Sequence, residues 1–248
     1  RAAAKNHNSV IPLSNVQSYY KFMDLFENND IPKDDRLTFA TEVFKMTSDY
    51  EVKIFNYFNK EDVILPENLN IHLYKESDFR YGENPHQSGA FYLEKDLTRS
   101  VWEQHQGKAL SYNNYNDLES AFCIANEFSE PSCAIIKHAN PCGFGIGEDL
   151  SIAYERAVST DPISYFGGIV GFNDVVDANL AKKLIKPFLE CIIAPEFSKE
   201  ALEIFKAKKN LRVLTLESTA AFSNLSIKSA AGGFVVQEKD SVKDDFNS

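Results

Sequence analysis

The sequence lacks several features that assign a protein to a broad class. None of its apolar runs approaches the roughly 18 residues of a membrane-spanning helix, so no membrane segment is predicted. The 26 basic residues are outnumbered by 36 acidic ones, and the net charge of −10 opposes nonspecific attraction to nucleic acid or to anionic membranes. We therefore expect neither nucleic acid nor a membrane as a partner.

Paired cysteines are also lacking. Four cysteines stand singly in apolar or turn contexts, without the spacing of a disulfide framework or of a zinc site. Isolated cysteines of this kind are typical of reduced thiols in a cytoplasmic protein, which is the location we expect. They are Cys123, Cys133, Cys142 and Cys191.

A zinc-deaminase signature is broken in this chain. Such enzymes carry H-x-E followed by P-C-x-x-C. Here His138-Ala-Asn140 lacks the glutamate, and Pro141-Cys142 is followed three residues later by Gly145 in place of the second cysteine. A catalytic zinc usually has three protein ligands, and no local set provides them, so no metal site is predicted.

Length and hydrophobic content bound the architecture. A chain of 248 residues with 44% hydrophobic residues can form one large domain or two ordinary ones. Its first residue is Arg1, and we expect the chain to be a fragment or a processed piece of a longer protein.

The segment before Pro66 has helical patterns. Ser14-Asn-Val-Gln17 fits a capping box and precedes Tyr19, Tyr20, Met23 and Phe26 at helical spacing. A second helix is expected after Asp34 or Asp35, either of which can cap it. Its apolar stripe, which ordinary core packing explains, is Leu37, Ala40, Phe44, Thr47, Ile54 and Phe58.

After Pro66 short strands alternate with helices, which predicts a layered α/β domain with its ligand site at strand ends. Strands are expected near Asn70–Leu73, Ala90–Leu93, Ala134–Lys137, Ile169–Phe172, Glu190–Ile193 and Phe234–Gln237, and helices near Asp117–Glu127, Ser151–Thr160, Ala178–Pro187 and Lys199–Lys208.

An apolar run ends at Lys137-His138, the best candidates for chemistry. Histidine titrates near neutrality, and a neighbouring cation favours its neutral, proton-accepting form. Successive strand residues point to opposite faces, so both side chains can serve one pocket only if the strand ends between them. Asn140-Pro141 and Gly143 make a turn there plausible. The alternative is a polar strand end with a solvated lysine.

Four further segments are rich in hydrogen-bonding groups or glycine. Arg80-Tyr-Gly-Glu-Asn-Pro-His-Gln87 is a loop whose arginine suits phosphate or carboxamide recognition, or a turn with a surface arginine. Gly107–Asp117 presents polar groups or merely caps a helix. Thr160–Gly168 lets backbone amides approach a ligand or is a plain turn. Gly143-Phe-Gly-Ile-Gly147 is a weak match to a phosphate loop, because it lacks GxGxxG spacing and the Walker lysine.

Taken together, an ordered series of motifs resembles the bifunctional purine biosynthesis proteins of bacteria. These join an IMP cyclohydrolase domain to an aminoimidazole carboxamide ribonucleotide (AICAR) formyltransferase domain. Arg1–His7 is similar to the last motif of the cyclohydrolase domain. The other motifs are Arg80–Gln87, Ser111-Tyr-Asn-Asn114, Lys137-His-Ala-Asn-Pro-Cys-Gly143, Thr160–Gly168, Ile192-Ile-Ala-Pro195 and Lys208-Lys-Asn-Leu-Arg212.

The resemblance implies a domain arrangement. Residues 1–65 would be the C-terminal part of the cyclohydrolase domain and a helical linker, and residues 66–248 the N-terminal half of the formyltransferase domain. The formyltransferase fold would be layered and cytidine-deaminase-like without zinc. Most of the cyclohydrolase and the second half of the formyltransferase, with much of the folate site, would lie outside this chain.

The resemblance also implies site roles. The reaction would be formyl transfer from the co-substrate 10-formyltetrahydrofolate to AICAR, without a metal. In this reaction His138 would be the general base, and Lys137 would stabilise the transition state. Lys5 would act in cyclisation to IMP and be idle here. The nucleotide would contact Arg80, Tyr81, Phe166, Gly167 and Glu190, although the human-type pattern has aspartate and glycine where this chain has Glu190-Cys191.

The resemblance further implies a homodimer with formyltransferase sites at the subunit interface. Two other functions stay open. One is a non-catalytic nucleotide-binding or dimerisation module, which would bind the ribonucleotide without turnover. The other is a metal-dependent nucleobase deaminase, which would hold stoichiometric zinc.

Overall fold

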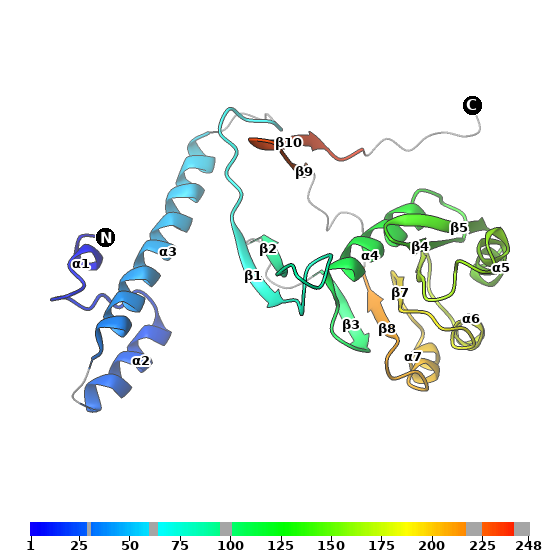
Figure 1. The fold of residues 1–248 in the computed structure, drawn as a ribbon, viewed down its shortest axis with the longest axis horizontal. Helices are drawn as coiled ribbons and strands as arrows, with labels where there is room; N and C mark the ends of the chain where they lie inside the picture. The colour runs from blue at the N-terminus through cyan, green and yellow to red at the C-terminus, as the bar shows by residue number, and fades with distance from the viewer. Residues whose placement is uncertain (29–30, 60–63, 95–100, 217–224, 241–248) are drawn as a thin grey trace. The chain divides into compact units, whose positions relative to one another are not determined.

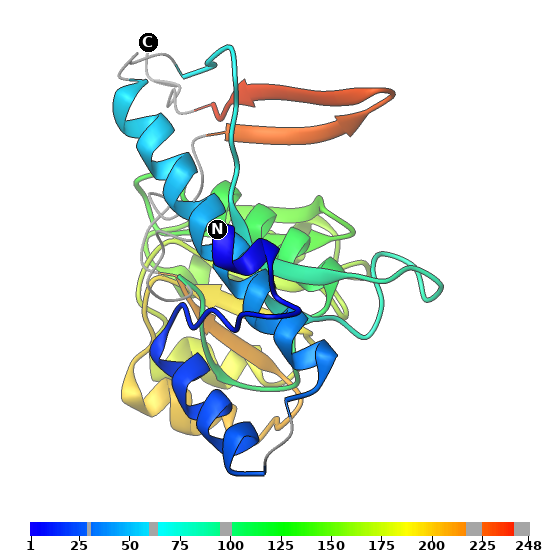
Figure 2. The ribbon, with the colours of Figure 1, turned by 90° about the vertical axis from the view of Figure 1, so that its left-hand side faces the viewer.

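The computed structural model describes residues 1–28, 31–59, 64–94, 101–216 and 225–240 (Figures 1 and 2). Contacts within the chain separate two compact units. We call Arg1–His72 the helical unit and Leu73–Ser248 the sheet unit. Each unit is described by itself.

The helical unit contains α1 (Ala2–Lys5), α2 (Val16–Glu27) and α3 (Lys33–Phe58). The capping box predicted at Ser14–Gln17 lies one residue later. Asn15 is the N-cap, with its side chain accepting from the backbone N–H of Ser18 at 2.8 Å and the Ser18 hydroxyl accepting from the Asn15 N–H at 3.1 Å. Asparagine is at least as good an N-cap as serine, which accounts for the shift.

The predicted second helix is α3, a single helix of 26 residues. Its N-cap is Pro32, and Asp34 and Asp35 lie in the first turn instead of capping it, where their charges favour the helix dipole. The face that it buries also differs from the predicted stripe: besides Ala40, it buries Phe39 and Val43, while Leu37 and Phe58 are exposed. Among the described residues, no helix has both the length and the apolar content needed to span a bilayer.

The sheet unit is built on a six-stranded mixed sheet in the order β3-β8-β7-β6-β4-β5. Strands β6, β7 and β8 are parallel to one another, whereas β4 is antiparallel to both β5 and β6, and β3 is antiparallel to β8. This confirms the predicted α/β class. The strands are β3 (Glu103–Gln106), β4 (Ser132–Lys137), β5 (Asn140–Ile146), β6 (Ile169–Phe172), β7 (Cys191–Ala194) and β8 (Arg212–Thr215).

Helices cover both faces of this sheet (Figure 1). On one face α4 (Tyr112–Ala125) packs on Ile136, Ile169 and neighbouring strand residues. On the other face Ile135 and Val170 contribute to a larger core with the remaining helices. Alternate strand residues therefore serve two cores, as a central strand requires. The helices of the second face are α5 (Leu150–Thr160), α6 (Ala178–Leu184) and α7 (Lys199–Phe205).

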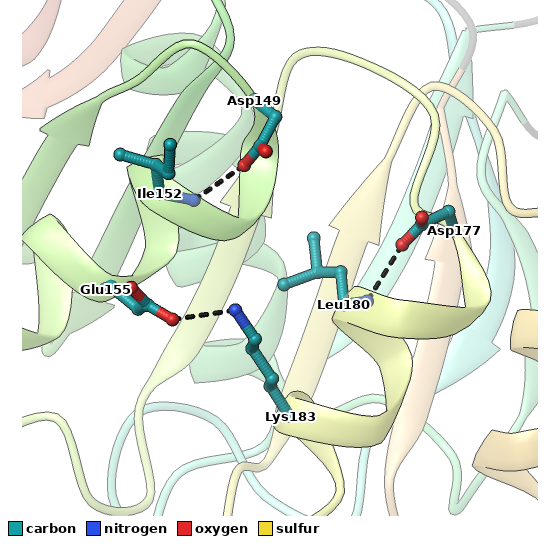
Figure 3. Close-up of polar contacts among 6 residues, drawn as sticks. All are labelled: Asp149, Ile152, Glu155, Asp177, Leu180 and Lys183. Atoms are coloured by element: carbon teal, nitrogen blue, oxygen red, sulfur yellow. Dashed lines mark hydrogen bonds and ion pairs between the residues drawn. The ribbon is translucent and has the colours of Figure 1, made fainter.

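The starts of α5 and α6 are set by aspartate caps (Figure 3). Asp149 accepts from the Ile152 N–H and Asp177 from the Leu180 N–H, both at 2.8 Å. Lys183 joins the two helices through an exposed 2.7 Å ion pair with Glu155. Because the ion pair is exposed, the caps contribute more to the two helices than it does.

Two antiparallel hairpins complete the sheet unit: β1 (Leu73–Asp78) with β2 (Ala90–Glu94), and β9 (Leu225–Ala230) with β10 (Gly233–Glu238). The strand expected at Asn70–Leu73 begins only at Leu73. Strands β3, β5, β8 and β9 were not predicted from the sequence.

The glycine-rich segment that weakly matches a phosphate loop is the strand β5. Its glycines allow α5 to pack closely. A Cβ atom at Gly143 would lie 2.3 Å from the carbonyl oxygen of Ala157, and one at Gly145 would lie 2.3 Å from that of Ala153. Because glycine and proline are depleted in strands, the composition of β5 concealed it.

Candidate functional site

Lys137 and His138 lie at the corner of the β4–β5 hairpin. Lys137 ends β4 and pairs with Asn140, the first residue of β5, so the turn consists of His138 and Ala139 alone. This turn precedes the predicted one at Asn140–Gly143. Both turn residues have positive φ, 55° and 58°, as a type I′ hairpin requires. The strand therefore ends between Lys137 and His138, the condition for both side chains to serve one site.

The Lys137 ammonium contacts the loop that precedes β6. It is half-buried and donates to the carbonyl oxygens of Phe166, at 3.0 Å, and Ser164, at 3.4 Å. This loop, predicted to present backbone groups, also has Gly167 at a φ of 73°, with its N–H donating to the Phe188 carbonyl at 2.8 Å. Phe166 and Gly167 thus lie on the segment that binds Lys137.

Asp161 stabilises the same loop. Its carboxylate accepts from the backbone N–H groups of Ser164, at 2.8 Å, and Ile163, at 3.0 Å. A hydrogen bond from the Ser164 side chain, then these backbone bonds and the positive charge of Lys137, lower the pKa of Asp161 below its ordinary value. The Asp161 carboxylate is therefore ionised at neutral pH and accepts these hydrogen bonds as an anion.

The first two turns of α4 contact three segments that carry predicted site residues. Ser111 caps the helix and Asn114 completes the capping box, so α4 begins at Tyr112, five residues before the helix start expected near Asp117 at the end of this segment. The Asn114 amide also donates to the Glu190 carboxylate at 3.2 Å, and Asp117 accepts from the Ala139 N–H at 2.6 Å. Asn113 donates to the Glu83 carbonyl, in the loop of Arg80, at 3.4 Å.

Arg80 and Tyr81 lie in the loop between β1 and β2. The loop closes on itself through the Gly82 N–H and the Gln87 carbonyl, 2.6 Å apart. Tyr115 of α4 packs against its two ends, with ring centroids 5.6 Å from Phe79 and 4.2 Å from Phe91. The exposed Arg80 guanidinium has no hydrogen-bond or ion-pair partner among the described residues. It is therefore available to an anionic ligand.

Strand register places Lys137 and Glu190 at one edge of the sheet. Ile136 pairs with Ile169, Ile169 with Cys191, and Cys191 with Arg212. The end of β4 therefore meets the beginnings of the parallel strands. Burial raises the pKa of the Cys191 thiol to about 12, so it is no nucleophile at neutral pH.

Three residues at this edge were not predicted as site residues from the sequence. Arg212, half-buried, donates from Nε to the Ala109 carbonyl at 3.1 Å. The other two, Asn114 and Asp117, lie in a segment whose polar content was recognised. A sequence pattern predicts an N-cap from spacing alone, but not the contacts that later side chains of the helix make with other strands.

Lys5 belongs to the helical unit, whereas the cluster described above is built from the sheet unit alone. It is the last residue of α1, and its side chain is exposed.

A half-open cavity of about 360 Å³ adjoins Phe188, whose ring packs on Phe166 with centroids 5.4 Å apart. Its lining is mainly apolar, with two lysines. The cavity is lined by Leu184, Pro187, Phe188, Leu189, Ala207, Lys208, Lys209, Asn210 and Leu211.

In the described parts of the chain, no group of three or more His, Cys, Asp or Glu side chains is arranged to hold a metal ion.

Comparison with known proteins identifies relatives over nearly the whole chain. The profile of the AICARFT/IMPCHase bienzyme family matches residues 3–248. The bifunctional purine biosynthesis protein PurH of Bacillus cereus (strain AH187) is 44% identical over 250 residues, covering 98% of this chain and 48% of that protein. PurH of Bacillus thuringiensis subsp. konkukian (strain 97-27) is 44% identical over 248 residues with the same coverage. The chain thus spans about half the length of these relatives.

Among solved structures, form 2 of Acinetobacter baumannii RibD is similar with a TM-score of 0.31 and 12% identity, over 42% of this chain and 35% of that one. This likeness is too low to support an argument about fold or function.

Proposed function

This chain belongs to the AICARFT/IMPCHase bienzyme family, and from that premise we propose that it carries part of a formyl-transfer site of de novo purine biosynthesis. The substrates are AICAR and 10-formyltetrahydrofolate. The observation that carries the proposal is the β4–β5 corner, where Lys137 ends β4 and His138 begins the turn, beside the segments of Phe166, Gly167 and Glu190.

The reaction needs a base because the AICAR amine is a poor nucleophile, its lone pair being delocalised into the ring and toward the carboxamide. The amine nitrogen attacks the formyl carbon, His138 takes the amine proton, and the bond from that carbon to N10 of the folate breaks as N10 is protonated. The exposed imidazole of His138 suits proton transfer to a bound ligand.

Lys137 stabilises the negative charge that develops on the formyl oxygen. Its ammonium has three N–H donors, and the Ser164 and Phe166 carbonyls accept from two of them. A third donor is therefore available for the oxyanion, and the two carbonyls hold the ammonium in one place before the reaction.

Nucleotide binding is assigned to the surrounding segments. Arg80 and Tyr81 bind the phosphate end, and arginine's planar fork suits this role. Phe166 and Gly167 lie against the base or ribose, and the Glu190 carboxylate accepts from the substrate. Asn114 supports the last role, because its amide occupies one Glu190 oxygen and orients the carboxylate.

We propose a domain assignment for the whole chain, which membership of the family supports. Residues 1–65 correspond to the end of the cyclohydrolase domain and a linker, and 66–248 to the first half of a cytidine-deaminase-like formyltransferase domain without zinc. Lys5 acts in cyclisation to IMP when the rest of that domain is present. We propose a cytoplasmic homodimer whose sites lie at the subunit interface.

The test is formyl transfer at saturating AICAR and 10-formyltetrahydrofolate, comparing the unmodified chain with His138→Ala. We expect the variant to lose on the order of 10²-fold or more in rate, because the proton has no acceptor. His105→Gln is the matched control and should leave the rate unchanged, since His105 lies on β3, where its ring bonds the Thr215 hydroxyl of β8. An equal rate in His138→Ala would contradict the assignment.

Absence of turnover in the unmodified chain would favour the non-catalytic alternative, provided that AICAR still binds by calorimetry and Arg80→Ala abolishes binding. The half-length match to the relatives makes this outcome worth measuring. Stoichiometric zinc in the purified chain would instead favour the nucleobase deaminase.

A further inference from the structure

The turn that carries His138 is costly by itself. Left-handed backbone brings the Cβ atom of an L-residue too close to the following carbonyl oxygen, and both turn residues adopt it without being glycine. Type I′ turns favour asparagine, aspartate or glycine at these positions, and alanine has no polar side chain to compensate locally. Contacts outside the turn must therefore hold it in place.

One of those contacts comes from α4. In a two-residue hairpin the closing hydrogen bonds join the flanking residues, here Lys137 and Asn140, so the Ala139 N–H needs an acceptor elsewhere. The Asp117 carboxylate provides it at 2.6 Å, a charge-assisted bond across 22 residues of sequence. The Asn140 side chain adds a second contact, donating to the His138 carbonyl at 2.9 Å.

Asp117 is itself held rigidly. The next residue, Leu118, is fully buried, as is Ala121 one turn later, and both pack on the sheet with Ile136 of β4. The helix that supplies the carboxylate and the strand that leads into the turn therefore share one core. This fixes the acceptor relative to the end of β4.

We propose that Asp117 is a positioning residue that holds the left-handed turn and thereby fixes the His138 imidazole relative to Lys137. The catalytic part of this proposal, that Asp117 positions the base, rests on the proposed formyl transfer. The structural part, that Asp117 holds the turn, does not depend on that function, because it concerns only the free chain.

The structural part is tested by NMR spectroscopy of the full chain. In Asp117→Ala we expect the Ala139 amide and the His138 imidazole resonances to move, while resonances of the buried Ile193 on β7 stay in place. Asp117→Asn should keep most of the wild-type positions, since its side-chain oxygen can accept the same bond. Adding Ala139→Gly to Asp117→Ala should restore the His138 resonances, because glycine adopts positive φ without steric cost.

A matched control tests whether losing a different hydrogen bond between an aspartate and the backbone also moves the His138 resonances. Asp149→Ala removes the N-cap of α5, a 2.8 Å bond to Ile152, and should leave the His138 resonances unchanged. Unmoved His138 resonances in Asp117→Ala would overturn the proposal, as would failure of Ala139→Gly to restore them. If Asp117→Ala does not fold, the comparison of Asp117→Asn with the double variant decides the same question.

The catalytic part is tested by kinetics on the same variants. We expect Asp117→Ala to lower kcat about 10- to 100-fold, as a base misplaced by about 1 Å would, with the KM for AICAR within about 3-fold of wild type. The double variant should recover part of the loss. A raised KM with unchanged kcat would contradict positioning of the base. If the unmodified chain shows no turnover, the proposed function fails, and the NMR comparison still decides the role of Asp117 in the turn.

Discussion

At the residue scale, Gly145 sets how closely β5 and α5 pack. An added Cβ would lie 2.3 Å from the Ala153 carbonyl and 2.7 Å from the Ala157 nitrogen, where the backbone cannot yield as a side chain would. We expect Gly145→Ala to lower the free energy of unfolding by about 1–3 kcal/mol, or more, through overpacking. Urea denaturation measures this. Gly233→Ala, where nothing lies within 4 Å of the added atom, is the control and should change stability little. Equal effects of the two substitutions would contradict the packing role.

At the scale of elements, Asn173 joins the end of β6 to the segment that enters β4. Its side-chain oxygen accepts from the buried Ser132 N–H at 2.8 Å, and its amide donates to the carbonyls of Phe128, at 3.0 Å, and Glu130, at 2.7 Å. Asn173→Ala leaves a buried donor without its acceptor and should cost about 1–3 kcal/mol. Urea denaturation gives the cost, and amide exchange at Ser132 should accelerate. Asn173→Asp keeps the acceptor and should protect Ser132 better than alanine does. Identical exchange in the two variants would refute this reasoning.

At the scale of the whole molecule, buried thiols make stability fall in alkali. Burial raises the pKa of Cys191 from 9.0 to about 12 and that of Cys133 well above 9.0. Because the folded pKa values are raised, the stability that these thiols contribute is complete below pH 9 and is lost as the unfolded thiols ionise above it. For Cys191 the loss continues up to about pH 12. Each thiol should lower the free energy of unfolding by about 1.4 kcal/mol per pH unit in that window.

Denaturation curves between pH 7 and 10.5 measure this slope. The double variant Cys133→Ala with Cys191→Ala should show a shallower decline than the parent chain, whatever its absolute stability. An unchanged slope would mean that other groups, such as Cys123, whose pKa burial raises to about 11, dominate the alkaline loss.

Elements with local patterns could be predicted from the amino-acid sequence. Ile169–Phe172 is a strand within the predicted bounds, and the helices of the sheet unit other than α4 begin within one residue of the predicted positions. Apolar periodicity and N-terminal caps act over a few residues, so a linear pattern contains them. The ordered motifs likewise identified the family, and they placed Lys137 and His138 at a strand end.

The remaining features depend on contacts between elements and could not be predicted from local patterns. Gly143 and Gly145 leave room for the backbone of α5, which packs directly on β5. The Asp117 carboxylate of α4 holds the turn because it accepts from the Ala139 N–H of another element. The left-handed backbone at His138 is likewise stable only through such contacts. Each depends on groups that are brought together by sheet order and helix packing. No local pattern carries that information, because the energy lies in contacts between segments that are distant in the chain.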